Sequence, residues 1–424
     1  MAPGSHDPSP DLRSSDLRLP AELRRVLVAV VAVFLLATVV GMVVLWPPAT
    51  TSSRLGAGAD LGTPVDLVNA TVLAAPAVPC RSGLPGAALT CRDVTARLDN
   101  GPEKGQTTAL DITEGPDQPT LRAGDKIVLG RAADPVAGVA YYFSDYQRRA
   151  PLLALGLLFA VAVVGLARWR GAAALLGLGA SLLVLVRFVL PAILAGRSAV
   201  AVAVVGSSLI AVVIIYLAHG VSARTTTAVL GTLMSLGLTA VLAVVFVELT
   251  QLTGLSSEEG TYLRGLLGGQ VNLRGLLLAG IVIGALGVLN DVTVTQASAV
   301  WEIYLANPSA GARQVYRSAM RIGRDHIAST VDTLVLAYAG AAMPLLVVFT
   351  VAGRRLGDVI TGEVVAAEVV QTLIGSLGLV AAVPVTTGLA ALLVTRTVPR
   401  RGGPDGRGAG RALARSASGR RGPG

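Results

Sequence analysis

The clearest pattern along the chain is a series of long apolar runs separated by short polar stretches. Several of these runs reach the roughly 20 residues that an α-helix needs to cross a bilayer. The eight runs cover residues 26–46, 151–167, 171–194, 198–218, 226–249, 275–294, 331–351 and 369–394. The pattern predicts an all-α polytopic membrane protein with about eight transmembrane helices.

The start of the chain predicts a leader and an anchor. Residues 1–25 are rich in Pro, Ser and Asp without apolar periodicity, so we expect a disordered cytosolic leader. The run 26–46 is longer than the core of a typical signal peptide, about 7 to 15 residues. It therefore favours an uncleaved first transmembrane anchor over a cleaved signal, and in both cases the chain that follows is exported.

Residues 47–150 have the pattern of a small β-domain inserted after the first helix. Short β-like runs at 65–73, 92–98, 107–112 and 126–130 alternate with turn residues such as Asn100-Gly101. We expect an extracytoplasmic β-rich domain, and the spacing of its turns suggests a partly closed barrel of the OB type.

Both cysteines of the chain, Cys80 and Cys91, lie in this predicted domain. An oxidising exterior favours a disulfide between them. Two cysteines alone do not make a closed zinc site, because structural zinc takes four ligands.

Charge and connectivity predict the orientation of the chain. Arginines gather at 168–170, in the stretch that holds Arg313, Arg317, Arg321 and Arg324, and in the tail 396–424, which we expect to be disordered. The positive-inside rule then places these segments and both termini in the cytosol, with the membrane domain at 151–395 in the plasma (cell) membrane.

The basic balance of the chain does not indicate a nucleic-acid partner. The net charge is +9, and the tail 396–424 holds eight Arg against one Asp, so most of the excess lies in the tail. The chain has no Gly-rich phosphate loop or ATPase motif, which argues against a nucleotide ligand. We expect no cofactor.

A polar stripe interrupts the apolar pattern at residues 285–302. At about 100° per residue, four of its side chains fall on one narrow helical face: Asp291, Thr295, Ser298 and Glu302. A buried carboxylate must be neutralised, paired or hydrated, so the stripe is a candidate substrate or ion site near the cytosolic side. The alternative is a helix end that faces water at the headgroups.

A second polar stretch, residues 324–333, precedes the next apolar run. Asp325 and Asp332 share one helical face, and His326 lies on the adjacent one. A depth count puts Asp332 level with Asp291, and His326 could relay protons or join acidic ligands on a cation. No metal-ligand spacing is recognisable, so the metal stays unknown, and a solvated interface is the alternative.

An arginine inside an apolar run indicates a structural ion pair. Arg187 lies far from the inner end of its run, and Glu248 falls near the same outer surface. The sequence predicts either that these two residues pair or that Arg187 reaches the headgroups. In the helix of the polar stripe, Gly280, Gly284 and Gly287 have the spacing of a close helix crossing.

Two blocks of sequence resemble a known family. GIVIGALGVLNDVTVTQASAVWE (280–302) and GRDHIASTVDTLVLAYAGAAMPLLVVF (323–349) are similar to the signature of the YibE/F family of bacterial multi-spanning membrane proteins. The resemblance extends from the first anchor, through YYFSDYQR (141–148), to the last run. The family is usually described only as a predicted permease, so the resemblance implies architecture more than activity.

The leading functional hypothesis is a secondary transporter or permease of unknown substrate, embedded in the lipid bilayer. The alternative is a non-transporting assembly or sensor protein whose exported domain binds an extracytoplasmic protein, and a homo-oligomer is compatible with both. An intramembrane aspartyl protease is disfavoured, because the chain reads Val288-Leu289-Asn290-Asp291 where Gly-x-Gly-Asp is expected. We therefore expect no enzyme activity.

Overall fold

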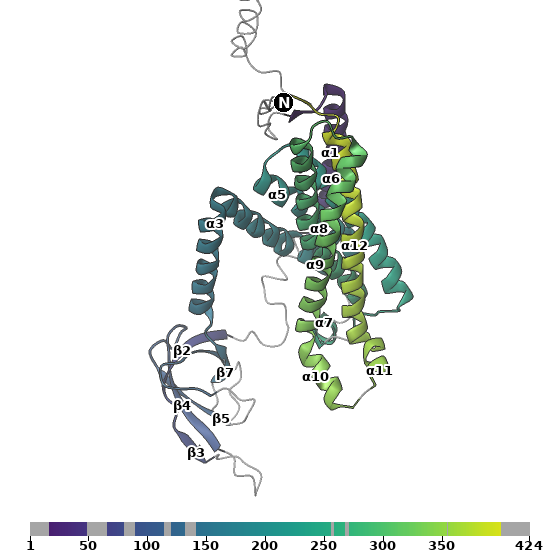
Figure 1. The fold of residues 1–424 in the computed structure, drawn as a ribbon. Coiled ribbons are helices and arrows are strands. Elements are labelled where there is room, and N and C mark those ends of the chain that lie inside the picture. Colours follow the sequence, from purple (N-terminus) through teal and green to yellow (C-terminus); the bar gives the residue numbers. More distant parts are fainter. Residues whose placement is uncertain are drawn as a thin grey trace, which may run out of the picture. The chain divides into compact units, whose positions relative to one another are not determined.

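The structure is a computed structural model of the chain, and it consists of two compact units. It describes residues 17–48, 66–79, 90–113, 120–131, 141–255, 258–267, 271–353 and 355–399. One unit comprises residues up to 51 together with 173–424, and the other comprises 52–172. The chain is mostly helical, with several long apolar helices and a small antiparallel sheet near the N-terminus (Figure 1). These features confirm the predicted, mainly helical chain with an inserted β-rich segment.

The larger unit is a bundle of long helices joined by short ones. Its helices are α1 (Ala21–Leu45), the end of α3 (Arg149–Val184), the π-helical turn η3 (Leu185–Val189), α4 (Leu190–Leu194), α5 (Ala199–His219), α6 (Ala223–Leu249), α7 (Glu258–Leu267), α8 (Leu273–Ala306), α9 (Ala312–Ala341), α10 (Met343–Val351), α11 (Leu356–Thr361) and α12 (Glu363–Val394). The apolar runs of the sequence therefore form helices, as predicted.

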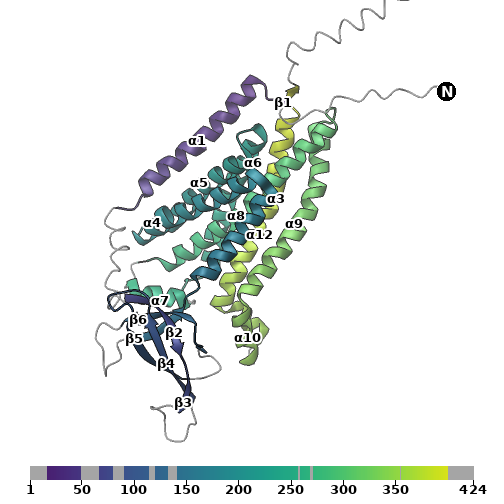
Figure 2. The same ribbon diagram turned by 90° about the vertical axis from the view of Figure 1, so that its left-hand side faces the viewer.

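Helix α8 lies at the centre of this bundle and packs against α5, α6, α9 and α12 (Figure 2). Close contact between α6 and α12 depends on glycine. A Cβ at Gly231 would lie 2.2 Å from Thr386 Oγ1, and one at Gly378 would lie 2.2 Å from Thr239 Oγ1. Small residues let helix backbones approach in lipid, where packing rather than hydrophobicity drives association.

The first helix belongs to the bundle, and both ends of the described chain meet there. Gly41 of α1 packs on Val205 of α5, since a Cβ at Gly41 would lie 2.7 Å from Val205 Cγ2. Strand β1 (Leu17–Arg18) pairs antiparallel with β8 (Val398–Pro399). The start of α1 and the end of α12 therefore lie at the same end of the bundle.

Counted by length and composition alone, the described helices give fewer candidate membrane spans than the predicted eight. Six described helices are long and apolar enough to cross a membrane, or seven if α9 and α10, which meet at a bend of 59°, form one span. The predicted runs 151–167 and 171–194 fall within one continuous stretch, Arg149–Leu194. Arg168 interrupts this stretch with a φ of 53°, a left-handed value that is uncommon for a residue with a Cβ.

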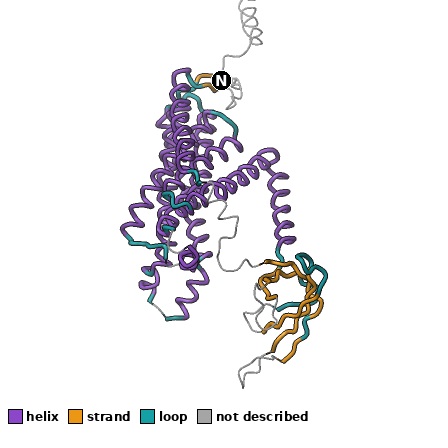
Figure 3. Tube along the Cα trace, turned by 180° about the vertical axis from the view of Figure 1, so that it is seen from behind, coloured by secondary structure: helices purple, strands orange, loops and turns teal. Residues whose placement is uncertain are grey.

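The smaller unit contains an antiparallel sheet of six strands (Figure 3). They are β2 (Asp66–Ala74), β3 (Ala77–Pro79), β4 (Thr90–Leu98), β5 (Thr107–Thr113), β6 (Lys126–Arg131) and β7 (Tyr141–Tyr146). Strand β4 pairs with β2 and β3 on one edge and with β5 on the other, while β2 also pairs with β6, and β6 with β7. Since β5 and β7 lie beside each other, the order is compatible with the predicted partly closed OB-type barrel.

Alternating side chains of these strands form the core of the sheet. Val68, Ala70 and Val72 of β2 are buried together with Val94 and Ala96 of β4. The turn between β4 and β5 has positive φ at Gly101 and Gly105, which glycine adopts without a steric penalty. The predicted strands at 65–73, 92–98, 107–112 and 126–130 each match an observed strand.

The predicted disulfide lies partly outside the described residues. Cys91 is 4% exposed and is disulfide-bonded. Its expected partner, Cys80, lies outside the described residues.

Candidate functional site

The polar stripe of α8 meets the polar stretch of α9 where a carboxylate approaches an imidazole. Asp291 Oδ2 lies 3.8 Å from His326 Nε2. The Asp291 side chain is 68% exposed on the bundle surface, whereas that of His326 is 28% exposed. His326 Nε2 is a buried atom without a hydrogen-bond partner in the described part of the chain. His326 is therefore partly enclosed by the bundle, whereas Asp291 is open to the surroundings.

The register of the α8–α9 hairpin explains this pair. The helices are joined by a short turn at 307–311, so residues equally far from the turn face each other. Asp291 lies 15 residues before Ala306, and His326 lies 14 residues after Ala312. The turn sequence Asn307-Pro308-Ser309 is a signal from which this register could have been predicted.

The same register corrects the predicted level of two aspartates. Asp332 lies six residues beyond His326 on α9, which is about 9 Å along the helix, so it is not level with Asp291. Asp291 also lies within two residues of the midpoint of α8, because α8 continues to Ala306 instead of ending near residue 294. The predicted depth was counted along the apolar run 275–294, which is shorter than helix α8.

A layer of buried polar side chains crosses the bundle beside this pair. The hydroxyls of Thr232 in α6 and Thr293 in α8 are 2.6 Å apart, and both residues are fully buried. Thr387 of α12 donates a hydrogen bond of 3.0 Å to Gln296 Oε1 of α8, and these residues are also fully buried. Three helices therefore share polar contacts at one level of the bundle.

Gly323 of helix α9 packs against Gln296 of this layer. A Cβ at Gly323 would lie 3.1 Å from Gln296 Nε2 and 2.6 Å from Val383 Cγ1 of α12. We call the buried set Thr232, Thr293, Gln296, Gly323 and Thr387 the polar layer.

The polar layer and its surroundings retain unused hydrogen-bonding capacity. Within the described part of the chain, Gln296 Nε2, Thr386 Oγ1, Ser235 Oγ and Asn290 Oδ1 are buried atoms without a hydrogen-bond partner. A buried polar group without a partner costs roughly 1–3 kcal/mol. Such a concentration is typical of a place that binds water or a ligand, or that changes its contacts.

The C-terminal part of the predicted stripe, Ser298 and Glu302, lies beside a different group of residues. Glu302 Oε1 is 4.0 Å from Arg224 Nη1 at the start of α6. Ser298, His219 and Arg224 line a small crevice between the α5–α6 turn and α8, and Thr295 is half-buried. The four stripe residues therefore divide between an Asp291–His326 site and a Glu302–Arg224 site, about 16 Å apart along α8.

The remaining predicted acids of α9 stand apart from these contacts. Asp325 and Asp332 are exposed on the bundle surface. Among the described residues, no group of three or more His, Cys, Asp and Glu side chains could hold a metal ion.

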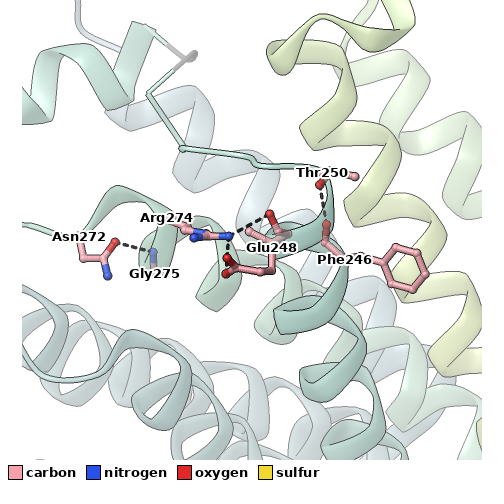
Figure 4. A network of polar contacts seen from close by, with 7 residues as sticks. Phe246, Glu248, Thr250, Asn272, Arg274 and Gly275 are labelled. Atoms are coloured by element: carbon pink, nitrogen blue, oxygen red, sulfur yellow. Dashed lines mark hydrogen bonds and ion pairs between the residues drawn. The ribbon is translucent and has the colours of Figure 1, made fainter.

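The predicted pair of Arg187 and Glu248 is replaced by another pair. Glu248 Oε2 accepts from Arg274 Nη2 at 2.7 Å, and the same guanidinium donates to the Val247 carbonyl at 3.2 Å (Figure 4). Arg274 lies at the start of α8, next to Asn272, which caps the helix by accepting from the Gly275 N–H. Arg187 lies in η3 and is exposed. The α6–α8 connection brings Arg274 back to the end of α6, which a count along separate runs does not reveal.

The polar pattern of the sequence indicated the exposed face of α8 but not its buried face. Thr293 and Gln296 follow Asn290 at intervals of three residues, which places them on a common helical face. Threonines in apolar helices commonly bond their own backbone, so Thr232 and Thr387 gave no distinct signal. Gln296, an amide within an apolar helix, was the available indication.

Comparisons with known proteins give a family and no close relative. No curated protein matches the chain, and no solved structure matches it. The sequence model of the YibE/F-like protein family matches residues 155–396, which include both signature blocks. The match covers more than half of the chain and omits α1 and the β-unit, to which the resemblance had been extended. The chain therefore belongs to the YibE/F-like family of proteins.

Proposed function

We propose that the protein is a secondary transporter in which Asp291 and His326 bind the coupling proton or a cationic substrate. The observation that carries this proposal is the 3.8 Å pair between a carboxylate and an imidazole near the middle of a long apolar helix. Ionisable residues within membrane helices are costly, and they commonly mark ion pathways and proton relays.

The two residues are suited to exchange charge. Histidine side chains commonly gain and lose protons near neutral pH, and carboxylates commonly bind protons and cations. Because Asp291 is open on one side and His326 Nε2 is enclosed, a proton or cation could reach the pair from the open side. The neighbouring polar layer then supplies the amide nitrogen of Gln296, and its surroundings supply the Thr386 and Ser235 hydroxyls, which have no hydrogen-bond partner among the described residues.

The arrangement of α8 and α9 supports access from one side of the membrane. We propose that both termini are cytosolic, which makes the α8–α9 turn cytosolic as well, and that the chain crosses the plasma membrane eight times. Between this turn and the Asp291–His326 pair, α8 carries the exposed carboxylate of Glu302 and the half-buried hydroxyls of Ser298 and Thr295. These groups would form a polar path from the cytosol to the pair.

A charge-movement experiment tests this proposal without knowledge of the substrate. The full chain is reconstituted in proteoliposomes on a solid-supported membrane, and a rapid pH jump is applied while the transient current is recorded. If protons bind at a site within the membrane, the jump gives a capacitive transient that empty liposomes lack. We expect the double variant Asp291→Asn, His326→Gln to lose most of this transient.

Asp325→Asn is the matched control, because it removes an exposed carboxylate next to His326 without touching the pair. It should keep the transient of the unmodified protein. The proposal is wrong if the unmodified protein gives no more charge movement than empty liposomes. It is also wrong if the double variant and the control give equal transients.

A second candidate function rests on the β-unit. A hollow of about 440 Å³ lies between β5 and β7 and is lined by Leu110, Asp111, Tyr142 and Phe143, among others. A hollow between two strands with apolar side chains at its base could bind a segment of an extracytoplasmic protein. In that case the protein would be a non-transporting sensor or assembly factor. Photocrosslinking from position 142 in cells tests this candidate. A specific crosslinked protein supports it, whereas its absence together with a pH-dependent transient favours the transporter.

A further inference from the structure

A row of arginines follows one face of α9 between the α8–α9 turn and the polar layer. Arg313, Arg317, Arg321 and Arg324 fall within about 80° around the helix and extend roughly 16 Å along it. All four are exposed, and none of them forms an ion pair with another described residue. We call this row the arginine face.

The opposite face of the same helix is fixed in the bundle. Val315 and Ala319 are fully buried, and they pack with Tyr304 of α8 and Val394 of α12. The helix therefore cannot turn its arginines inward without losing this core. The arginine face consequently belongs to the outer surface of the bundle, at the end where α12 finishes.

The arginine face borders a hollow of about 830 Å³. The four arginines line it together with Tyr316 and Ser318. The nearest acid on this helix is Asp325, which follows Arg324 directly and is itself exposed. Four guanidinium groups against one carboxylate leave the hollow strongly positive.

The arginine face extends so far along the bundle that lipid hydrocarbon chains would be expected beside it, and charged groups are unfavourable there. Arg324 follows Gly323, which is level with Val383 of α12, 11 residues before the end of that helix. At this level α12 carries no charged residue, whereas α9 presents charge. Lipid chains do not solvate guanidinium groups, so polar headgroups must reach this face of α9.

We propose that the arginine face binds the phosphate group of an anionic phospholipid. Guanidinium groups form paired hydrogen bonds with phosphate oxygens, and basic clusters at membrane helices attract acidic lipids. A lipid fits better than an acidic protein, because the same helical face continues beyond Arg324 with Ala328, Val331 and Val335, which would receive the acyl chains. This inference is independent of the proposed transport.

Native mass spectrometry of the full chain in detergent tests the proposal. The delipidated protein is titrated with phosphatidylglycerol, with phosphatidylcholine, and separately with inorganic phosphate. We expect phosphatidylglycerol to bind far more tightly than either of the other two. The triple variant Arg317→Gln, Arg321→Gln, Arg324→Gln should bind it on the order of 100-fold more weakly, since each arginine contributes about a fivefold factor.

The matched control is Arg197→Gln, Arg264→Gln, Arg355→Gln, which removes three exposed arginines near the opposite end of the bundle. This control should bind phosphatidylglycerol as the unmodified protein does. Equal loss in both triple variants would show nonspecific attraction and overturn the proposal, as would equal binding of the two lipids. Inorganic phosphate bound as tightly as the lipid would also overturn it.

Two further measurements keep the test informative if the triple variant does not fold. Binding of phosphatidylglycerol to the unmodified protein should weaken as salt increases, because opposite charges are screened. The variant Arg317→Lys, Arg321→Lys, Arg324→Lys retains the charge and should retain most of the binding. Binding that is insensitive to salt contradicts the proposal, and so does crosslinking of an acidic protein to the arginine face in place of lipid.

Discussion

Gly323 of α9 lies directly against the side-chain amide of Gln296 in α8, so that a single added carbon at position 323 would lie 3.1 Å from Nε2 and 3.2 Å from Oε1. The same carbon would lie 2.6 Å from Val383 Cγ1 of α12. Three helices thus approach one another at a position where only hydrogen fits without a shift.

Gly323→Ala should therefore loosen the bundle. We expect the overpacking to cost roughly 1–3 kcal/mol of unfolding free energy. The loss would appear as a lower thermal midpoint of the detergent-solubilised protein. Gly340→Ala is the matched control in the same helix, since a Cβ there would contact nothing within 4 Å. It should leave the midpoint unchanged or raise it, because alanine favours the helix by roughly 0.5–1 kcal/mol over glycine. Equal midpoints for the two variants would refute the close contact at Gly323.

The hydroxyl pair of Thr232 and Thr293 should show non-additive mutations. Each Thr→Val change alone removes the contact between the helices, leaves the other hydroxyl only its bond to its own backbone, and should cost about 1 kcal/mol. The double variant removes both hydroxyls and should cost less than the sum of the single variants. The measurement is a double-mutant cycle of unfolding in mixed micelles. Strict additivity would contradict the 2.6 Å contact.

Glu248 should be coupled to Arg274 and not to Arg187. The Glu248–Arg274 pair is partly exposed, so we expect a coupling energy of no more than about 1 kcal/mol. The Arg274→Gln change should have the larger single effect, because it also removes the bond to the Val247 carbonyl. Double-mutant cycles of Glu248→Gln with Arg274→Gln and with Arg187→Gln make the comparison. Coupling to Arg187 alone would favour the pair expected from sequence.

Tyr141 should make the β-unit sensitive to alkaline pH. Burial, together with the hydrogen bond of 2.9 Å that Tyr141 donates to Glu103 Oε2, raises the pKa of the phenol. A raised pKa stabilises the folded state below the ordinary tyrosine pKa of about 10, and this contribution is lost as the pH rises through the raised value. The stability of the unit should therefore fall in that alkaline range.

Ultraviolet titration of tyrosinate in the full chain tests this prediction. Tyr141→Phe should remove a tyrosine that ionises late, and Glu103→Gln should move that ionisation to lower pH. Arg131, which lies 3.1 Å from Glu103, stays in place in both variants. An unchanged late ionisation in Tyr141→Phe would show that another tyrosine is responsible.

Much of the fold could be predicted because its signals are local. The apolar runs became helices, and the alternating runs near Val68 and Val94 became the strands of the β-unit. Asp291 and His326 were also recognised as candidates, since charge within an apolar helix is visible in the sequence.

The contacts between side chains of different helices could not be predicted from such local patterns. The partners of Asp291 and Glu248 depend on which residues the connecting turns bring together. A depth count along separate runs treats each helix as if it ended with its apolar run, and α8 continues well beyond residue 294. The buried face of Thr293 and Gln296 was not predicted, because the threonines that contact it from α6 and α12 look like any other helical threonines in the sequence.

The pairing of β1 with β8 has a consequence for the order of synthesis. Leu17 and Arg18 are made before every helix of the bundle, and their partners Pro399 and Val398 are made after all of these helices. The N-terminal segment must therefore remain unpaired until translation of the last helix is complete. A chain that stops before residue 398 would retain all the long helices and still lack the pairing of β1 with β8. The pairing can therefore form only after all the helices of the bundle have been synthesised.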